Sequence, residues 1–157
     1  MHRRAADLAA FATAALTAVG LGAVGLVAAA PALADPTGQL RAAVAATRAT
    51  SCDPLRSDPV VEQAAAEINR TIGLWLDKSS RAEPESDAMP LLKDLGYPGT
   101  KSKILWGAGK NEADAIKGAI LQGFAAIPDC GYTDFGASVT QGNNAAGWVL
   151  AAVVLGG

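Results

Sequence analysis

Histidine is almost absent from this chain of 157 residues, which has a single one, at position 2. Serine and cysteine nucleophiles are usually activated by a histidine, so catalysis of that kind is excluded once the first residues are removed. Zinc sites built from histidines or from several cysteines are excluded as well, since the chain has only two cysteines. We therefore expect no catalytic residue, no bound metal and no cofactor.

An excess of positive charge is also lacking. The whole chain has a formal net charge of −2, and residues 35–157 alone carry −3, because Arg3, Arg4 and Asp7 together contribute +1 to the first 34 residues. A mildly acidic domain lacks the basic surface that attracts nucleic acid or anionic lipid. We expect no nucleic-acid partner, and we expect a monomer.

One long apolar run is present, at the beginning of the chain. Arg3 and Arg4 precede residues 8–30, which carry no charge, and Ala32-Leu33-Ala34 is a small-residue cleavage pattern. This arrangement predicts a secretory signal peptide over residues 1–34, and a secreted or cell-envelope domain over residues 35–157. The alternative is an uncleaved membrane anchor, because the run exceeds the roughly 20 residues that span a bilayer.

Cys52 and Cys130 are the only cysteines, and they are separated by 78 positions. They form no Cys-x-x-Cys motif, which argues against a redox or metal-binding pair. In an exported protein an isolated pair of cysteines indicates one disulfide. We predict a Cys52–Cys130 bond that ties the first helix to the segment before a late strand.

Residues 35–157 predict one domain in which helices precede most of the strands. Thr37 is the expected cap of a first helix over residues 38–50, and Asp58 with Pro59 begins a second helix. Further elements are expected over residues 89–95 (helix), 104–106 (apolar run), 111–127 (helix with Asp114 in its first turn), 135–139 (strand) and 148–155 (strand). This order predicts an α+β domain with helices packed on a small antiparallel sheet.

The apolar periodicity assigns a buried face to each long helix. In the first helix we expect Leu40, Val44 and Thr47 to be buried; in the second we expect Asn69 on the polar face. In the helix that begins near Asn111, the expected buried residues are Ile116, Ala119, Ile120, Phe124 and Ile127.

Three features could carry chemistry. Gly107-Ala108-Gly109-Lys110 resembles a phosphate-binding turn, but it lacks the spacing and the Ser or Thr of a P-loop. Glu83, Glu85 and Asp87 form either a weak cation site or a solvated loop. Trp75, Trp106 and Trp148 either fill the core, where Trp148 in particular is expected to be buried, or line an apolar pocket for a lipid or another ligand.

The order of these segments resembles the CAP superfamily, which contains the cysteine-rich secretory, allergen and pathogenesis-related proteins. The resemblance covers nearly all of residues 35–157. It rests on the helix and Cys-Asp-Pro-Leu loop up to Ala65, on Gly96-Tyr97 and residues 104–109, and on Cys130-Gly131-Tyr132-Thr133-Asp134-Phe135-Gly136-Ala137-Ser138-Val139 before the apolar strand from Trp148 to Leu155. The resemblance implies an α-β-α sandwich, an extracellular location and, as in some members, lipid or sterol binding.

The chain departs from that family at its cleft. The family's cleft usually carries two histidines and two acidic residues. Ile68 or Asn69 stands where the first histidine is expected, and residues 124–127 stand where the second is expected. The Glu-Asn pair of the family's middle motif is expected near Lys103, where the charge is reversed. We therefore transfer no site residue from the family.

The sequence thus predicts a secreted, non-catalytic CAP-like domain that binds a partner at the cell envelope or outside the cell, with an apolar ligand as one candidate. A carboxylate-based hydrolase is an alternative, and so is a structural or host-facing surface protein without a small ligand. The hydrolase would require Glu62, Glu67, Asp114 and Asp134 to converge in one concave site.

Overall fold

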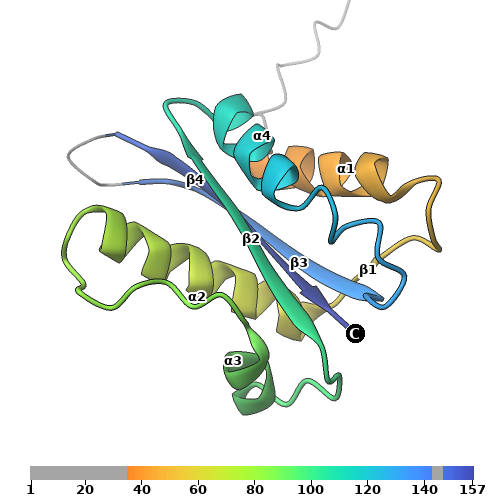
Figure 1. The fold of residues 1–157 in the computed structure, drawn as a ribbon. Coiled ribbons are helices and arrows are strands. Elements are labelled where there is room, and N and C mark those ends of the chain that lie inside the picture. The colour runs from red at the N-terminus through yellow and green to blue at the C-terminus, as the bar shows by residue number, and fades with distance from the viewer. Residues whose placement is uncertain (1–34, 143–146) are drawn as a thin grey trace, which may run out of the picture. The chain divides into compact units, whose positions relative to one another are not determined.

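The computed structural model describes residues 35–142 and 147–157 (Figure 1). The expected signal peptide lies outside these residues. The elements follow one another along the chain as α1 (Pro36–Arg48), β1 (Arg56–Ser57), α2 (Pro59–Leu76), α3 (Met89–Asp94), β2 (Ser102–Gly109), α4 (Glu112–Gln122), β3 (Asp134–Gln141) and β4 (Val149–Gly156). Every helix expected from the sequence is present, and the apolar run at residues 104–106 is the middle of a full strand.

The four strands form one sheet in the order β1-β3-β4-β2. β4 pairs antiparallel with β2 on one side and with β3 on the other, over its whole length. The two residues of β1 pair with β3 in parallel, which the sequence did not indicate because a two-residue strand has no periodicity of its own. The expected α+β class is confirmed, and the sheet is antiparallel apart from this short edge strand.

Helices cover both faces of the sheet, so the domain is an α-β-α sandwich (Figure 1). α1 and α4 pack on one face, where Leu40 and Val44 meet Leu105 and Ile127 in one core cluster. α2 and α3 cover the other face, where Ile72 and Leu92 pack with strand residues in a second cluster. All eight residues of β4 are buried, as a central strand between two helical layers requires.

Two of the helices that cover the sheet, α2 and α4, begin as the sequence predicts. The carboxylate of Asp58 accepts hydrogen bonds from the backbone N–H groups of Val60 and Val61, and Pro59 occupies the first helical position of α2. The Asn111 side chain accepts from the N–H of Asp114 at the start of α4. The expectation that Thr37 caps α1 is wrong, because that helix begins earlier, after Asp35.

Several expectations about buried faces are wrong. Ile116 and Ile120 were expected to be buried and are only half-buried, packed against the core. α4 ends at Gln122, so Phe124 lies beyond the helix in a turn and is 76 % exposed. Thr47 is only half-buried, because Arg48 takes the inward position at the end of α1. Asn69 is buried rather than solvated, since α2 lies directly on the sheet at this point.

The close approach of helices to the sheet depends on glycine. A Cβ atom on Gly136 would lie 2.2 Å from the carbonyl oxygen of Val61 in α2, and one on Gly107 would lie 2.2 Å from that of Ala115 in α4. A side chain at either place would push a helix off its face of the sheet. Among the described residues, no helix is long and apolar enough to cross a membrane.

Candidate functional site

Glu62 is the first of the four carboxylates that the hydrolase alternative requires. It binds the backbone of β3 just beyond the residues that pair with β1. Its Oε1 accepts from Arg41 Nε at 3.0 Å and from Ser57 Oγ at 2.8 Å, and its Oε2 accepts from the backbone N–H of Ala137 at 3.1 Å. Burial opposes the charge, but the hydrogen bonds from Arg41, Ala137 and Ser57 outweigh it and lower the pKa of Glu62. The carboxylate therefore stays ionised and is held by partners from α1, β1 and β3.

Asp134 is buried at the start of β3. Its Oδ2 accepts from the Tyr97 hydroxyl at 2.8 Å and from Thr133 Oγ1 at 2.9 Å, and Arg56 Nη2 lies 2.8 Å from Oδ1. Burial, together with the hydrogen bond to Asp134, raises the pKa of Tyr97. This cluster joins the loop after α3 to the first residues of β1 and β3.

The other two carboxylates lie elsewhere. Glu67 accepts two hydrogen bonds from Arg70 on the surface of α2, and Asp114 accepts from Asn111 at the start of α4. Each of the four carboxylates thus has its own partners. Within the described residues, no group of three or more histidine, cysteine, aspartate or glutamate side chains could hold a metal ion.

The positions at which the CAP resemblance would place cleft ligands have other roles. Ile68 is part of the core beneath α2. Asn69 Nδ2 donates to the carbonyl oxygen and to Oγ of Ser138, both at 3.1 Å, which fastens α2 to β3. Lys103 is exposed on β2, and residues 124–127 form the turn after α4. A resemblance in chain order could not have revealed that Asn69 is buried.

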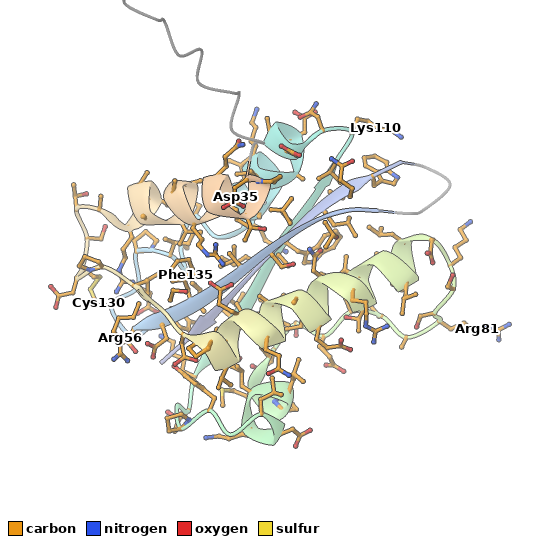
Figure 2. All side chains as sticks on the ribbon, turned by 180° about the vertical axis from the view of Figure 1, so that it is seen from behind. Asp35, Arg56, Arg81, Lys110, Cys130 and Phe135 are labelled. Carbon is orange, nitrogen blue, oxygen red and sulfur yellow. A yellow bond between two sulfur atoms is a disulfide. The ribbon has the colours of Figure 1, made fainter. Side chains whose placement is uncertain are left out.

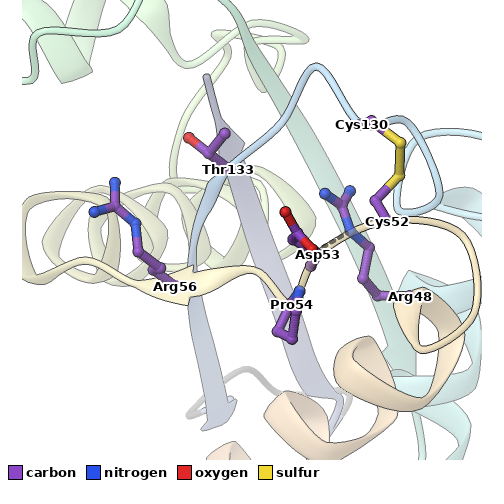
Figure 3. A pocket seen from close by; sticks show the side chains of 7 residues that line it. All are labelled: Arg48, Cys52, Asp53, Pro54, Arg56, Cys130 and Thr133. Carbon is purple, nitrogen blue, oxygen red and sulfur yellow. Dashed lines mark hydrogen bonds between the residues drawn. A yellow bond between two sulfur atoms is a disulfide. The ribbon is translucent and has the colours of Figure 1, made fainter.

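Cys52 and Cys130 form the predicted disulfide, with their Cα atoms 5.4 Å apart. The bond forms one wall of a pocket of about 560 Å³ (Figure 3). The remaining lining residues are Arg48, Asp53, Pro54, Arg56 and Thr133. The pocket lies between the segment that follows α1 and the segment that precedes β3.

Arg48 is 3 % exposed and holds those two segments together. Its guanidinium donates to four backbone carbonyl oxygens at 2.8–2.9 Å, which belong to Asp53, Ile127, Asp129 and Tyr132. The guanidinium thus crosslinks the segment after α1 and the segment before β3, next to the disulfide. The sequence gives no signal for this role, because an arginine in the last turn of a helix is ordinarily solvated.

A smaller pocket of about 220 Å³ adjoins the disulfide pocket. Its walls are largely apolar and include Val44, Ala45, Leu55 and Phe135. Pockets that enclose drug-sized ligands usually measure about 300–1,000 Å³. This one therefore fits a small apolar group rather than a whole sterol.

The three tryptophans all lie half-buried on the α2 side of the sheet. The rings of Trp75 and Trp106 meet edge to face, with centroids 6.5 Å apart and planes at 81°. The ammonium of Lys110 lies 4.4 Å from the ring centroid of Trp148. The expectation that Trp148 is buried is wrong, because it lies just before β4 and is only half-buried, packed against the cluster on the α2 side.

Two further pockets are lined in part by residues of α2. Trp75 lines one of about 550 Å³, together with residues from the end of α2 and the loop that follows. The other, of about 300 Å³, lies between α2 and α3, where Glu85 and Asp87 are at its rim with Glu67 and Asp94. Asp87 is not free there, because it accepts from Ser102 Oγ and from the N–H of Met89.

The comparisons with known proteins inform the fold. No family model matches the chain, and no curated protein matches its sequence. Among solved structures it is similar to an outer surface protein from Borrelia burgdorferi, with a TM-score of 0.61 and 13 % sequence identity. The match covers 77 % of this chain and 91 % of that protein. At this identity the similarity shows a shared α+β fold.

Proposed function

We propose that this chain is an exported, non-catalytic domain that binds a partner at the cell envelope or outside the cell. The observation that carries the proposal is the fold shared with an outer surface protein. The disulfide agrees with it, because such bonds persist outside the reducing cytoplasm, and so does the N-terminal segment with its Ala32-Leu33-Ala34 ending. Membership of the CAP superfamily is part of the same proposal and rests on the order of the sequence segments.

Two observations favour binding over catalysis. Glu62 and Asp134 are each held by three partners within the domain, and Glu67 and Asp114 lie apart from them. The apolar pocket next to Phe135 supports a small apolar ligand as a second candidate. Incubation with a fatty-acid mixture followed by native mass spectrometry tests that candidate, and a spectrum of the unliganded protein alone would contradict it.

Export can be tested by expressing the full chain in a bacterium with an intact secretion pathway. We expect to find the protein in the envelope or medium. Its mass should be that of a chain that begins at Asp35, less the two hydrogens lost in forming the disulfide. Ala34→Arg should block processing and serves as the control. Full-length protein with two free thiols in the cytoplasm would refute the proposal.

A further inference from the structure

The tryptophans of this domain are not among its fully buried residues. The largest fully buried side chains are leucine, isoleucine, valine and asparagine, and none is aromatic. All three tryptophans are instead half-buried on one side of the sheet. Tryptophan combines a large apolar face with a polar N–H, and partly exposed rings of this kind are enriched where proteins bind partners.

One of these rings forms part of a pocket with basic residues. The pocket of about 550 Å³ at the C-terminal end of α2 is lined by Trp75, Leu76, Lys78, Ser80 and Arg81, which we call the aromatic–basic site. Trp106 from β2 supports the Trp75 ring from the side, at an interplanar angle of 81°. The loop is fixed to the helix by a hydrogen bond of 2.9 Å from the N–H of Ser80 to the carbonyl oxygen of Leu74.

The two basic side chains of the site are available to a ligand. In the part of the chain that the structure describes, the four ion pairs use Arg41, Arg56, Arg70 and Lys101. Lys78 and Arg81 take part in none of them, and Arg81 projects from the domain in Figure 2. The nearest carboxylate in sequence, that of Asp77, accepts the N–H of Ser79 and so faces the turn.

The position of Lys78 is unusual. It is the one residue other than glycine with a positive φ, 62°, among those described. Glycine or asparagine is the usual residue where a helix ends in this left-handed conformation, because a Cβ is unfavourable there. Lysine therefore occupies a place where glycine would be more stable, and it brings a positive charge to the rim of the pocket.

The chemistry of these groups selects a class of ligand. An aromatic face packs against the C–H face of a sugar ring, the Ser80 hydroxyl can exchange hydrogen bonds with sugar hydroxyls, and Lys78 and Arg81 can pair with an acidic substituent. A lipid tail would require an enclosed apolar wall, whereas three of the five lining residues here are polar. We propose that the aromatic–basic site binds an acidic sugar unit, carrying a carboxylate or a phosphate, of an anionic glycan.

This inference rests on the proposed role at the cell envelope, because an exported protein meets such polymers there. The charge of residues 35–157 is −3, so the attraction is local to this pocket rather than spread over the domain. Binding should then require both the sugar ring and the acid, and should weaken as salt is added.

The test compares a tetramer of galacturonic acid with the matching neutral galactose tetramer, titrated into the exported protein and followed by tryptophan fluorescence and calorimetry. We expect the acidic tetramer to bind at least ten times more tightly than the neutral one. Inorganic phosphate alone should not displace it at equal concentration. Equal affinity for both tetramers, equal competition by phosphate, or no binding of either tetramer would overturn the inference.

Lys78→Gly is the decisive variant, because it removes the charge and also the Cβ that makes a positive φ unfavourable. Its melting temperature should be at or above that of the parent, while its affinity for the acidic tetramer falls at least fivefold. Arg81→Ser should weaken binding similarly, and Lys117→Ser on the exposed surface of α4 is the matched control that should not. Parental affinity in Lys78→Gly and Arg81→Ser would refute the assignment.

The two proposals can fail separately. If the protein is exported but binds neither tetramer, the inference about the site fails and the proposed function stands. If the protein is not exported, the proposed function fails, and this result does not bear on the site.

Discussion

At the scale of single residues, Gly136 determines how closely α2 approaches the sheet. A methyl group at this position would lie 2.2 Å from a backbone oxygen of α2, and backbone cannot move aside as a flexible side chain can. Gly136→Ala should therefore lower the free energy of unfolding by about 1–3 kcal/mol, the usual cost of overpacking. Urea denaturation followed by circular dichroism measures this change.

Gly73 provides the matched control for that substitution. It lies within α2, where a Cβ would meet only the Cδ1 atom of Leu150, at 3.3 Å. Alanine is favoured over glycine in a helix by about 1 kcal/mol, so Gly73→Ala should leave stability unchanged or increased. If both variants were equally stable, the close approach at Gly136 would not limit the packing of α2.

Glu62 should make the stability of the domain sensitive to acid. Its pKa is lowered in the folded state, so the carboxylate stabilises the fold above its ordinary pKa of about 4.3, and this contribution is lost as the pH falls through the lowered value. Glu62→Gln should weaken the fold at pH 7, because the ion pair with Arg41 is lost. Between pH 5 and pH 3 the free energy of unfolding of the variant should also fall less than that of the parent.

The exposed carboxylate of Glu67 is the control for that titration. Its hydrogen bonds with Arg70 also lower its pKa, but the pair lies on the surface and is screened by solvent. Glu67→Gln should follow the parent's pH profile closely in chemical denaturation from pH 7 to pH 3. A Glu62→Gln profile indistinguishable from the parent's would show that the edge of β3 does not depend on this charge.

At the scale of elements, the sequence predicts those features that depend on neighbours along the chain. The caps at Asp58 and Asn111 were predictable, since a helix begins where a side chain can accept an N–H two or three positions later. The strand at residues 149–156 was predictable too, because an uninterrupted apolar run of that length requires cover on both faces.

Features that depend on contacts distant in sequence were not predictable. Arg48 binds carbonyl oxygens 79–84 positions away, and Asn69 binds Ser138 across 69 positions. Neither contact leaves a periodic pattern. The same limit explains Phe124, whose spacing fits the buried stripe of α4 although the helix has already ended at Gln122. At the candidate site, Trp75 was identifiable as a large apolar side chain, but its grouping with Lys78 and Arg81 required the fold.

The disulfide joins two elements that only tertiary structure brings together. It links the loop after α1 to the loop before β3, where Arg48 bonds the same two segments. The two cysteines are 78 positions apart. Removing the bond should lower the free energy of unfolding by about 2–4 kcal/mol, because the unfolded chain regains conformational freedom. Cys52→Ser/Cys130→Ser should therefore melt well below the parent, as differential scanning calorimetry would record.

Because the arginine bonds remain, the cysteine variant should still fold. Its near-ultraviolet circular dichroism at low temperature should match that of the oxidised parent. A melting temperature equal to the parent's would mean that Arg48 alone holds these segments, and a variant without tertiary signal would mean that the disulfide is required for folding.

At the scale of the whole molecule, the described residues of the range 35–157 form one compact unit. The two core clusters on either side of the sheet draw all their members from residues 40–155. A chain that begins at Asp35 therefore contains every residue of these two clusters. It has 123 residues, enough for a stability of about 5–15 kcal/mol.

We accordingly expect residues 35–157 to fold without the N-terminal segment and to unfold in a single cooperative transition. The two clusters share the sheet between them, so loss of one removes the support of the other, and both should melt together. Trp106 and Trp148 pack against the cluster on the α2 side, so tryptophan fluorescence reports on that face alone. Tyr97 belongs to the same cluster and Tyr132 to the cluster on the opposite face, so tyrosine fluorescence reports on both faces. Coincident guanidinium unfolding curves from tryptophan and tyrosine fluorescence would support one cooperative domain. Separate midpoints would show that the faces unfold independently, and that the central strand β4 does not couple them.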